Sequence, residues 1–402
     1  MSVARFISSK IKTGNTIGLI SVAVSIFIIL VAIAVLKGFK TEIREKASGF
    51  MGEAALVAPG QTPVNEHYPI SSKLSYRDKL LDMHCVESLS DVAYATGILK
   101  TEESLSGATF KGVDSLYNFK FFESCLVDGA LPEYGSKLSF EILVSRRLAD
   151  RMGYQVGSPV SAYFVGEDVR VRKFNVCGIY DAQLEEIDNM LIVTDIAQVR
   201  RINGWDSGKV SAVEVNLISG ADMDKAEREI SELIYNQSDE TDDSVFVTTA
   251  KRQFPNLFDW LALLDYNVLI VIILMIIVAG FNMMSALLII LFEKTSMIGL
   301  LKSLGMSNKG VAKVFRRVGL NIVLKGLAVG NAAAIAVCLL QKYFKIITLD
   351  PANYFVKYVP IGLDVASVIL ADLLSVIAIM GILRLTTFFI SRVSPDKTMS
   401  VE

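Results

Sequence analysis

The stretch that decides the fold is TIGLISVAVSIFIILVAIAVL, residues 16–36, which carries no charged side chain. A helix of roughly 20 apolar residues spans the ~30 Å hydrocarbon core of a bilayer. Three further runs of this kind lie near the C-terminus, at Asn267–Leu291, Val318–Leu340 and Leu363–Leu383. A long polar stretch separates the first run from the other three. The sequence therefore predicts a membrane α-helical protein with four transmembrane helices, one N-terminal and three C-terminal, around a large extramembrane domain.

The composition excludes several classes of function. The 402 residues are 52% hydrophobic and carry a formal net charge of −2, with no basic stripe, so we expect no nucleic-acid partner. His67 and His84 are isolated, and we expect no metal site and no cofactor in this chain. The four cysteines show no CxxC spacing. Cys338 falls inside a predicted span, and the odd count of three in the large domain (Cys85, Cys125 and Cys177) favours buried free thiols over one disulfide.

The first apolar run has two interpretations. Basic residues precede it and an Ala-x-Ala occurs at Ala32–Ala34, as in a cleaved signal peptide. Its apolar core is longer than the usual ~7–15 residues of such a peptide, which favours a retained helix.

Charge sets the expected orientation. Arg5, Lys10 and Lys12 precede the first run, and Arg384, Arg392 and Lys397 follow the last one. The loop between the second and third runs carries Lys294, Lys302, Lys309, Lys313, Arg316 and Arg317 against Glu293 alone. Basic loops stay in the cytoplasm. We therefore expect a multi-pass membrane protein with both termini cytoplasmic and the large domain exoplasmic.

These features divide the chain into three parts. Residues 1–40 are the cytoplasmic N-terminus and the first transmembrane helix, and residues 41–262 are the extramembrane domain. Residues 263–402 hold the other three transmembrane helices, with a cytoplasmic loop at 293–317.

The extramembrane domain has an α+β pattern. Short runs of alternating or β-branched residues predict strands. They are Ala54–Ala58, Val92–Ile98, Ala108–Val113, Ile142–Val144, Val160–Val165, Arg170–Ile179, Met190–Val193 and Val210–Leu217. Ser145–Met152 and Ala221–Tyr235 have the pattern of helices, and Gly166-Glu167-Asp168 that of a hairpin turn. The acidic groups Glu185, Glu186, Asp188 and Ser238–Ser244 are interpreted as solvated loops.

The segment KRQFPNLFDWLALLD, residues 251–265, leads into the second span. Its apolar residues recur at helical spacing, and Trp260 suits the headgroup layer. We expect this segment to lie along the outer membrane surface.

The inner loop begins with a short amphipathic segment, EKTSMIGLLKSLGM, residues 293–306. Thr295 or Ser296 could cap a helix there and Gly305 could end it. Met297, Leu301 and Leu304 form an apolar stripe, with Ile298 and Lys302 at its sides. From composition alone, such a helix could lie on lipid or insert into a groove on a partner protein.

This segment resembles the coupling segment of the MacB/FtsX/LolC-type ABC transporter permeases, whose pattern is E-K-x-x-E-I-G-I-L-K-A-L-G. The matching residues are Glu293, Lys294 and Ile298–Gly305, while Met297 stands where the family has an acid. FNMMSAL, residues 281–287, and Lys37-Gly38-Phe39 are similar to motifs of the LolC/LolE branch. The tail Val393–Ser400 is a degraded form of the family's P-x-x-A-L-R.

The resemblance implies that ATP hydrolysis and transport are carried out by separate chains. No GxxxxGK[ST] occurs in the sequence, so ATP is expected to bind to a separate cytoplasmic ABC ATPase. The chain itself is then not an enzyme. Coupling to the ATPase is assigned to Glu293, Lys294, Met297, Ile298, Leu301, Lys302, Leu304 and Gly305. A second permease chain, identical or related, completes the membrane part.

Few charged residues lie in the predicted spans. Lys325 is in the third span, and Asp364 and Asp372 are in the fourth. Charges in hydrocarbon are costly and mark functional candidates. We expect Lys325 and Asp372 to pair, and Asp364 to lie at the end of its span.

The resemblance favours a permease of the mechanotransmission type that releases lipoproteins from the inner membrane for transfer to the outer membrane. Its partners would be a lipoprotein substrate, membrane lipid and a periplasmic lipoprotein carrier. The hairpin at Tyr163–Val171 is short for a carrier-binding arm. A MacB-like efflux permease and an FtsX-like regulator of a cell-wall hydrolase are the alternatives.

Overall fold

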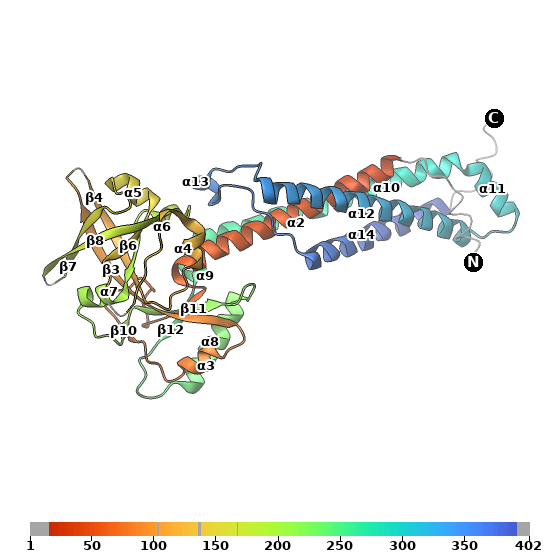
Figure 1. The fold of residues 1–402 in the computed structure, drawn as a ribbon. Helices are drawn as coiled ribbons and strands as arrows, with labels where there is room; N and C mark the ends of the chain where they lie inside the picture. The colour runs from red at the N-terminus through yellow and green to blue at the C-terminus, as the bar shows by residue number, and fades with distance from the viewer. Residues whose placement is uncertain (1–15, 103, 136–137, 167, 392–402) are drawn as a thin grey trace. The chain divides into compact units, whose positions relative to one another are not determined.

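The computed structural model describes residues 16–391 except 103, 136–137 and 167 (Figure 1). Arg5, Lys10, Lys12 and the tail Val393–Ser400 therefore lie outside the described residues. The chain divides into two compact units. The membrane unit holds the residues up to Thr41, Trp260–Thr348 and the residues from Tyr358 onward. The extramembrane domain holds Glu42–Asp259 together with Leu349–Lys357.

Long apolar helices form the membrane unit. They are α2 (Thr16–Met51), α10 (Pro255–Glu293), α12 (Asn308–Phe344) and α14 (Val365–Ser391), with the short α11 (Thr295–Ser303) between α10 and α12. Among the described residues, four helices are long and apolar enough to cross a membrane, one near the N-terminus and three near the C-terminus. The predicted arrangement of spans is confirmed.

Glycines bring α2 and α12 into close contact. Gly326 and Gly330 of α12 lie four residues apart, so they share one face of the helix. A Cβ atom added at Gly330 would lie 2.6 Å from the carbonyl oxygen of Ala23, and one at Gly326 would lie 2.8 Å from Val22. Helices in lipid associate through such small-residue faces because no water is released to drive them together.

The FNMMSAL run packs α10 against α2. The amide of Asn282 donates a 2.7 Å hydrogen bond to the hydroxyl of Ser21, and Met283 is buried. The methyl group of Ala286 lies 2.9 Å from where a Cβ of Gly18 would be. Residues that resemble the LolC/LolE branch thus have a packing role in this chain.

The segment at 251–265 does not form a separate surface helix. α9 (Ala250–Gln253) is followed by its capping residue Phe254, and α10 begins at the next residue, Pro255. Proline suits the first position of a helix because its missing N–H would be unpaired there in any case. Asn256 to Asp265 are therefore the first turns of the spanning helix itself, which corrects the expectation from sequence.

The extramembrane domain is built on one mixed sheet. Its strands are β1 (Ala54–Val57), β3 (Val86–Lys100), β4 (Leu105–Val113), β5 (Leu126–Gly129), β6 (Glu141–Ser145), β7 (Pro159–Val165), β8 (Val169–Tyr180), β9 (Leu191–Asp195), β11 (Ala212–Leu217) and β12 (Phe246–Thr249). Within the described residues, β3, β4, β9, β6, β8 and β7 pair in that order, and β7 pairs again with β3. These six strands close a ring.

The rest of the sheet extends from β3 through β11 and β1 to β12, while β5 pairs with β8. A separate two-stranded sheet pairs β2 (Ile70–Ser71) with β10 (Lys209–Val210). The helices of this domain are α3 (Arg77–Leu81), α4 (Lys120–Cys125), α5 (Arg146–Met152), α6 (Glu185–Asp188), α7 (Ile196–Asn203) and α8 (Met223–Gln237), together with α9 and with α13 (Pro351–Tyr354) in the connection between α12 and α14. Ser145, Asp195 and Asp222 cap α5, α7 and α8 through their side chains. A buried apolar core lies among the strands and these helices.

The α+β pattern predicted from sequence is confirmed, while several details differ. β3 is longer than expected, and α7 was not predicted because it is short and polar on average. The acidic groups are not simply solvated: Asp188 is buried, and Asp242 and Asp243 accept hydrogen bonds from Ser75 and Ser71. These carboxylates accept hydrogen bonds from backbone N–H groups that would otherwise lack an acceptor.

Candidate functional site

The short helix α11 is formed much as the sequence predicts, but its cap differs. The helix begins at Thr295, so Lys294 holds the cap position, and it makes no side-chain cap bond. Gly305 follows the helix in the left-handed conformation (φ +88°), as expected for a terminating glycine.

The apolar residues of this segment differ in their surroundings. Met297 and Ile298 pack against the core of the membrane helices. Leu300 and Leu304, which directly follows the last residue of α11, are 63% and 77% exposed. The side chain of Leu301 lies outside the described ones. Leu300 was not assigned a coupling role from sequence, and its i, i+4 spacing with Leu304 was the available signal.

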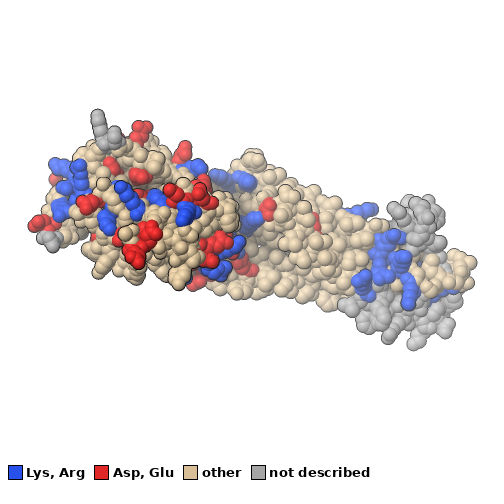
Figure 2. All heavy atoms as spheres, turned by 90° about the horizontal axis from the view of Figure 1, so that it is seen from below, with Lys and Arg blue, Asp and Glu red and all other residues tan. Residues whose placement is uncertain are grey.

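Positive charge gathers at this end of the membrane unit, as Figure 2 shows. The segment contributes Lys302, Lys309, Lys313, Arg316 and Arg317, while Glu293 is exposed and Lys294 half-buried. The two exposed leucines thus project from a basic surface, an arrangement suited to a partner with an apolar groove and acidic rim.

The predicted pair of Lys325 and Asp372 is wrong. Asp372 of α14 accepts a 2.7 Å hydrogen bond from the amide of Asn331 on α12. Lys325 is exposed and lies six residues, or roughly 9 Å along the axis, from Asn331. Six residues also turn a helix by about 240°, so Lys325 faces another direction. Asn331 is a polar group in the span that a search for charged residues could not reveal.

Asp364 lies at the end of its span, as expected. Its carboxylate accepts bonds from the ammonium of Lys37 at 2.7 Å and the hydroxyl of Ser367 at 3.1 Å. The hydrogen bond from Lys37 is the main cause that lowers the pKa of Asp364 to about 2, and Ser367 adds to it. Gly38 and Gly362 touch beside this ion pair, so the start of α14 lies directly on α2.

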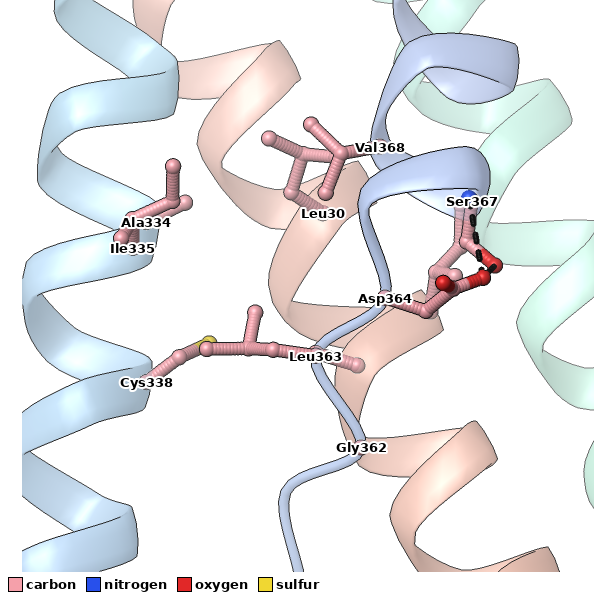
Figure 3. Close-up of a pocket in the computed structure, with 11 residues that line it drawn as sticks. Leu30, Ala334, Ile335, Cys338, Gly362, Leu363, Asp364, Ser367 and Val368 are labelled. Atoms are coloured by element: carbon pink, nitrogen blue, oxygen red, sulfur yellow. Dashed lines mark hydrogen bonds between the residues drawn. The ribbon is translucent and has the colours of Figure 1, made fainter.

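A small pocket lies next to this joint (Figure 3). The side chains of Asp364 and Ser367 lie at one edge of it. The other lining residues are mostly apolar: Leu30, Ile33 and Ala34 of α2, Ala334, Ile335 and Cys338 of α12, and Leu363 and Val368. Its enclosed volume of ≈ 10 Å³ is about that of one water position. It is too small for an acyl chain, so we interpret it as a packing gap.

A buried lysine ties the end of α2 to the sheet. The ammonium of Lys111 on β4 donates to the carbonyl oxygen of Phe50 at 2.5 Å and to the Tyr117 hydroxyl at 2.9 Å. It also lies 2.8 Å from the carboxylate of Glu214 on β11, which accepts a bond from the Tyr94 hydroxyl. Both charged side chains are fully buried.

The position of Lys111 suits its charge. Burial lowers the pKa of this ammonium, but the Glu214 carboxylate and the Tyr117 hydroxyl outweigh that effect and hold it above its usual value. The last carbonyl groups of a helix carry partial negative charge and have no partner within the helix. Lys111 satisfies one of them, so the C-terminus of α2 is fixed on the sheet.

The connection between α12 and α14 also reaches the extramembrane domain. Lys46, near the end of α2, donates to the carbonyl oxygen of Phe355 at 2.8 Å and to the side chain of Gln183 at 2.9 Å. Lys357 pairs with Asp181 at 2.8 Å. Phe355 and Gln183 have positive φ angles of +60° and +65°, which non-glycine residues adopt only when their surroundings hold them there.

The family models agree with this architecture. Residues 17–233 match the MacB-like periplasmic core domain, and residues 269–395 match the FtsX-like permease C-terminal. The chain therefore belongs to the family of MacB/FtsX-type permeases.

Two curated relatives are LolC proteins. The chain is 24% identical over 436 residues to the lipoprotein-releasing system transmembrane protein LolC of Neisseria meningitidis serogroup B, covering 99% of this chain and 96% of the relative. It is 22% identical over 410 residues to LolC of Xylella fastidiosa strain Temecula1, covering 92% of this chain and 91% of that one. The protein is thus an inner-membrane permease of the LolC/MacB/FtsX type.

Solved structures of extramembrane regions are also similar. The periplasmic region of MacB from Actinobacillus actinomycetemcomitans matches with a TM-score of 0.36 at 13% identity, covering 54% of this chain and 97% of that one. The extracellular domain of the transporter YknZ from Gram-positive bacteria matches with a TM-score of 0.33 at 14% identity, covering 48% and 98%.

We predict that Lys111→Met destabilises the extramembrane domain by about 3–5 kcal/mol, because the buried carboxylate of Glu214 loses its cation. Thermal unfolding of the purified full-length protein should show a clear drop in melting temperature. Adding Glu214→Leu should restore much of it, since a neutral pair leaves no buried charge. Lys173→Met, at an exposed site, is the control. Equal melting temperatures for Lys111→Met and the control would contradict the prediction.

A second prediction concerns pH. The pKa of Asp188 is raised to about 6, mainly because the carboxyl group is buried and further because the negative charge of Asp181 lies nearby. A carboxyl group whose pKa is higher in the folded state than its usual 3.8 destabilises the fold once it ionises, so stability falls as pH rises from about 4 to 6.

Asp188→Asn should therefore stabilise the fold by up to about 3 kcal/mol at pH 7, which raises the melting temperature. At pH 4 the melting temperature should stay nearly unchanged. Melting curves of both proteins across this range measure the effect. A gain of the same size at pH 4 would show that ionisation is not its cause.

Proposed function

We propose that this chain is the permease subunit of a mechanotransmission ABC transporter that releases lipoproteins from the inner membrane for transfer to the outer membrane. The similarity to two LolC proteins along nearly the whole length of both partners carries this proposal. The FNMMSAL run and the Lys37-Gly38-Phe39 exit from the first span, both similar to the LolC/LolE branch, support it.

A separate cytoplasmic ATPase supplies the energy in this proposal. The sequence contains no phosphate-binding loop of the GxxxxGK[ST] type, so the chain binds no nucleotide in that manner. The exposed Leu300 and Leu304 insert into a groove on the ATPase, and the basic residues beside them contact its rim. Met297 and Ile298 join α11 to the membrane helices, so that a displacement of α11 is passed on.

The membrane helices pass this displacement to the extramembrane domain. α2 has a rigid attachment there through Lys111, and the α12–α14 connection has another through Lys46 and Lys357. The basic loop and basic termini support the orientation in this proposal, with α11 in the cytoplasm and the large domain in the periplasm. A second permease chain and a periplasmic carrier complete the system in this proposal.

Depletion of the protein in its host tests the function. We expect outer-membrane lipoproteins to accumulate in the inner membrane, as measured by membrane fractionation and immunoblotting. Altered drug or toxin sensitivity with normal lipoprotein sorting would favour a MacB-like efflux permease instead. The match with the MacB-like core domain is consistent with that alternative as well. A division defect with normal sorting would favour an FtsX-like regulator.

The coupling surface has its own test. Leu300→Asp with Leu304→Asp should abolish copurification of the ATPase, because two charges would enter an apolar groove. Ser296→Asp, at an exposed position of the same helix, adds a charge without removing an apolar anchor and serves as the control. If the ATPase copurifies with the double variant as with the unchanged protein, the two leucines do not form the contact.

A further inference from the structure

The chain forms a short hook where α12 ends, over residues 342–348. The helix stops at Phe344, because Lys345 adopts the left-handed conformation (φ +50°) while its N–H donates to the carbonyl oxygen of Gln341 at 2.9 Å. The buried side chain of Gln341 holds the backbone beyond the helix end in place. It accepts from the N–H of Ile347 at 2.9 Å and donates to the carbonyl oxygens of Ile347 and Val359 at 3.1 and 3.2 Å.

This fixed hook displays apolar side chains outward. Tyr343, Phe344, Ile346 and Ile347 are 77, 71, 67 and 55% exposed. Large apolar side chains gathered this closely on a surface mark a contact with lipid or with another protein. The internal hydrogen bonds keep them exposed, since the backbone cannot turn them inward without breaking the bonds to Gln341.

The hook carries cations of its own. Lys342 and Lys345 are both exposed, and residues 342–349 contain no acid. The ammonium of Lys345 lies 5.2 Å from the centre of the Tyr358 ring, which leaves its remaining protons free for an anion. Lysines beside apolar side chains suit the headgroup region of a membrane, where lipid phosphates lie next to the acyl chains.

The hook begins just beyond the predicted third span, Val318–Leu340. The helix α12 itself ends at Phe344. The same unit places charged pairs at the ends of the neighbouring spans on this side, Lys40 with Asp265 and Lys37 with Asp364. Trp260 packs against Phe39, the residue before Lys40, as expected for the headgroup layer.

We propose that residues 342–348 form a lipid-binding surface for the leaflet on the side of the extramembrane domain, with the lysines on the phosphates of anionic phospholipids. Tyr343, Phe344, Ile346 and Ile347 enter the boundary between headgroups and acyl chains. A second copy of the chain fits this surface poorly, because a two-fold contact would bring the lysines of both copies together. The proposal does not depend on which substrate the permease releases.

Depth measurements on the full-length chain test the insertion. A fluorescent label at Phe344→Cys, in a variant with the four native cysteines replaced by serine, is placed in nanodiscs that contain anionic phosphatidylglycerol. We expect nitroxides at the headgroup end of the acyl chains to quench the label several-fold more than a water-soluble quencher does. Tyr235→Cys on α8, at an 87% exposed site, should show the opposite order.

The lysines have a separate test. Lys342→Gln with Lys345→Asn should lower the preference for phosphatidylglycerol over phosphatidylcholine by about fivefold per lysine, measured by association of spin-labelled lipids. Asparagine tolerates the left-handed conformation that Lys345 adopts. Lys100→Gln with Lys173→Gln, both exposed on the extramembrane domain, should leave the preference unchanged.

Three results would overturn the proposal. The first is stronger quenching of the hook label from water than from lipid. The second is a label protected from both quenchers, which means that protein covers the hook. The third is loss of the lipid preference on adding inorganic phosphate, which assigns the lysines to a free anion.

Discussion

The buried contact of Lys111 with the end of α2 is the constraint on which the extramembrane domain depends. Two charges without solvent are stable only when their hydrogen bonds are complete, and here Phe50, Tyr117, Glu214 and Tyr94 complete them. The contact joins a helix terminus to two strands of the sheet. α2 is one continuous helix from Thr16 to Met51, and its residues from Glu42 onward belong to the extramembrane domain.

Among the described residues, close backbone contacts and a few polar hydrogen bonds, rather than a buried ion pair, hold the membrane unit together. Apolar side chains gain little by leaving lipid for another apolar surface, so close backbone contact and a few polar bonds decide which helix faces which. Gly326 and Gly330 allow the close contact, while Asn282 with Ser21 and Asn331 with Asp372 supply polar bonds. The same unit leaves many apolar side chains exposed, as lipid contact requires.

The candidate site divides into parts that sequence could and could not reveal. The end of α11 at Gly305 and its amphipathic character follow from local spacing, whereas Lys294 rather than Thr295 or Ser296 holds the cap position. Which apolar residues stay exposed could not be predicted, because packing against the other membrane helices decides it and no local pattern specifies that packing. The bond between Asn331 and Asp372 was missed for a similar reason: an uncharged residue gives no signal until its partner is known.

The sequence alone determined the spans, the α+β character of the domain and the family. Each of these depends on patterns within one stretch of chain: an apolar run long enough for a bilayer, an alternation of period two, or a short motif. The tertiary structure alone decided the closed ring of strands, the partner of Lys111 and the hook after α12. These features join residues far apart in the chain, and their free energy comes from pairings and packing that no local pattern specifies.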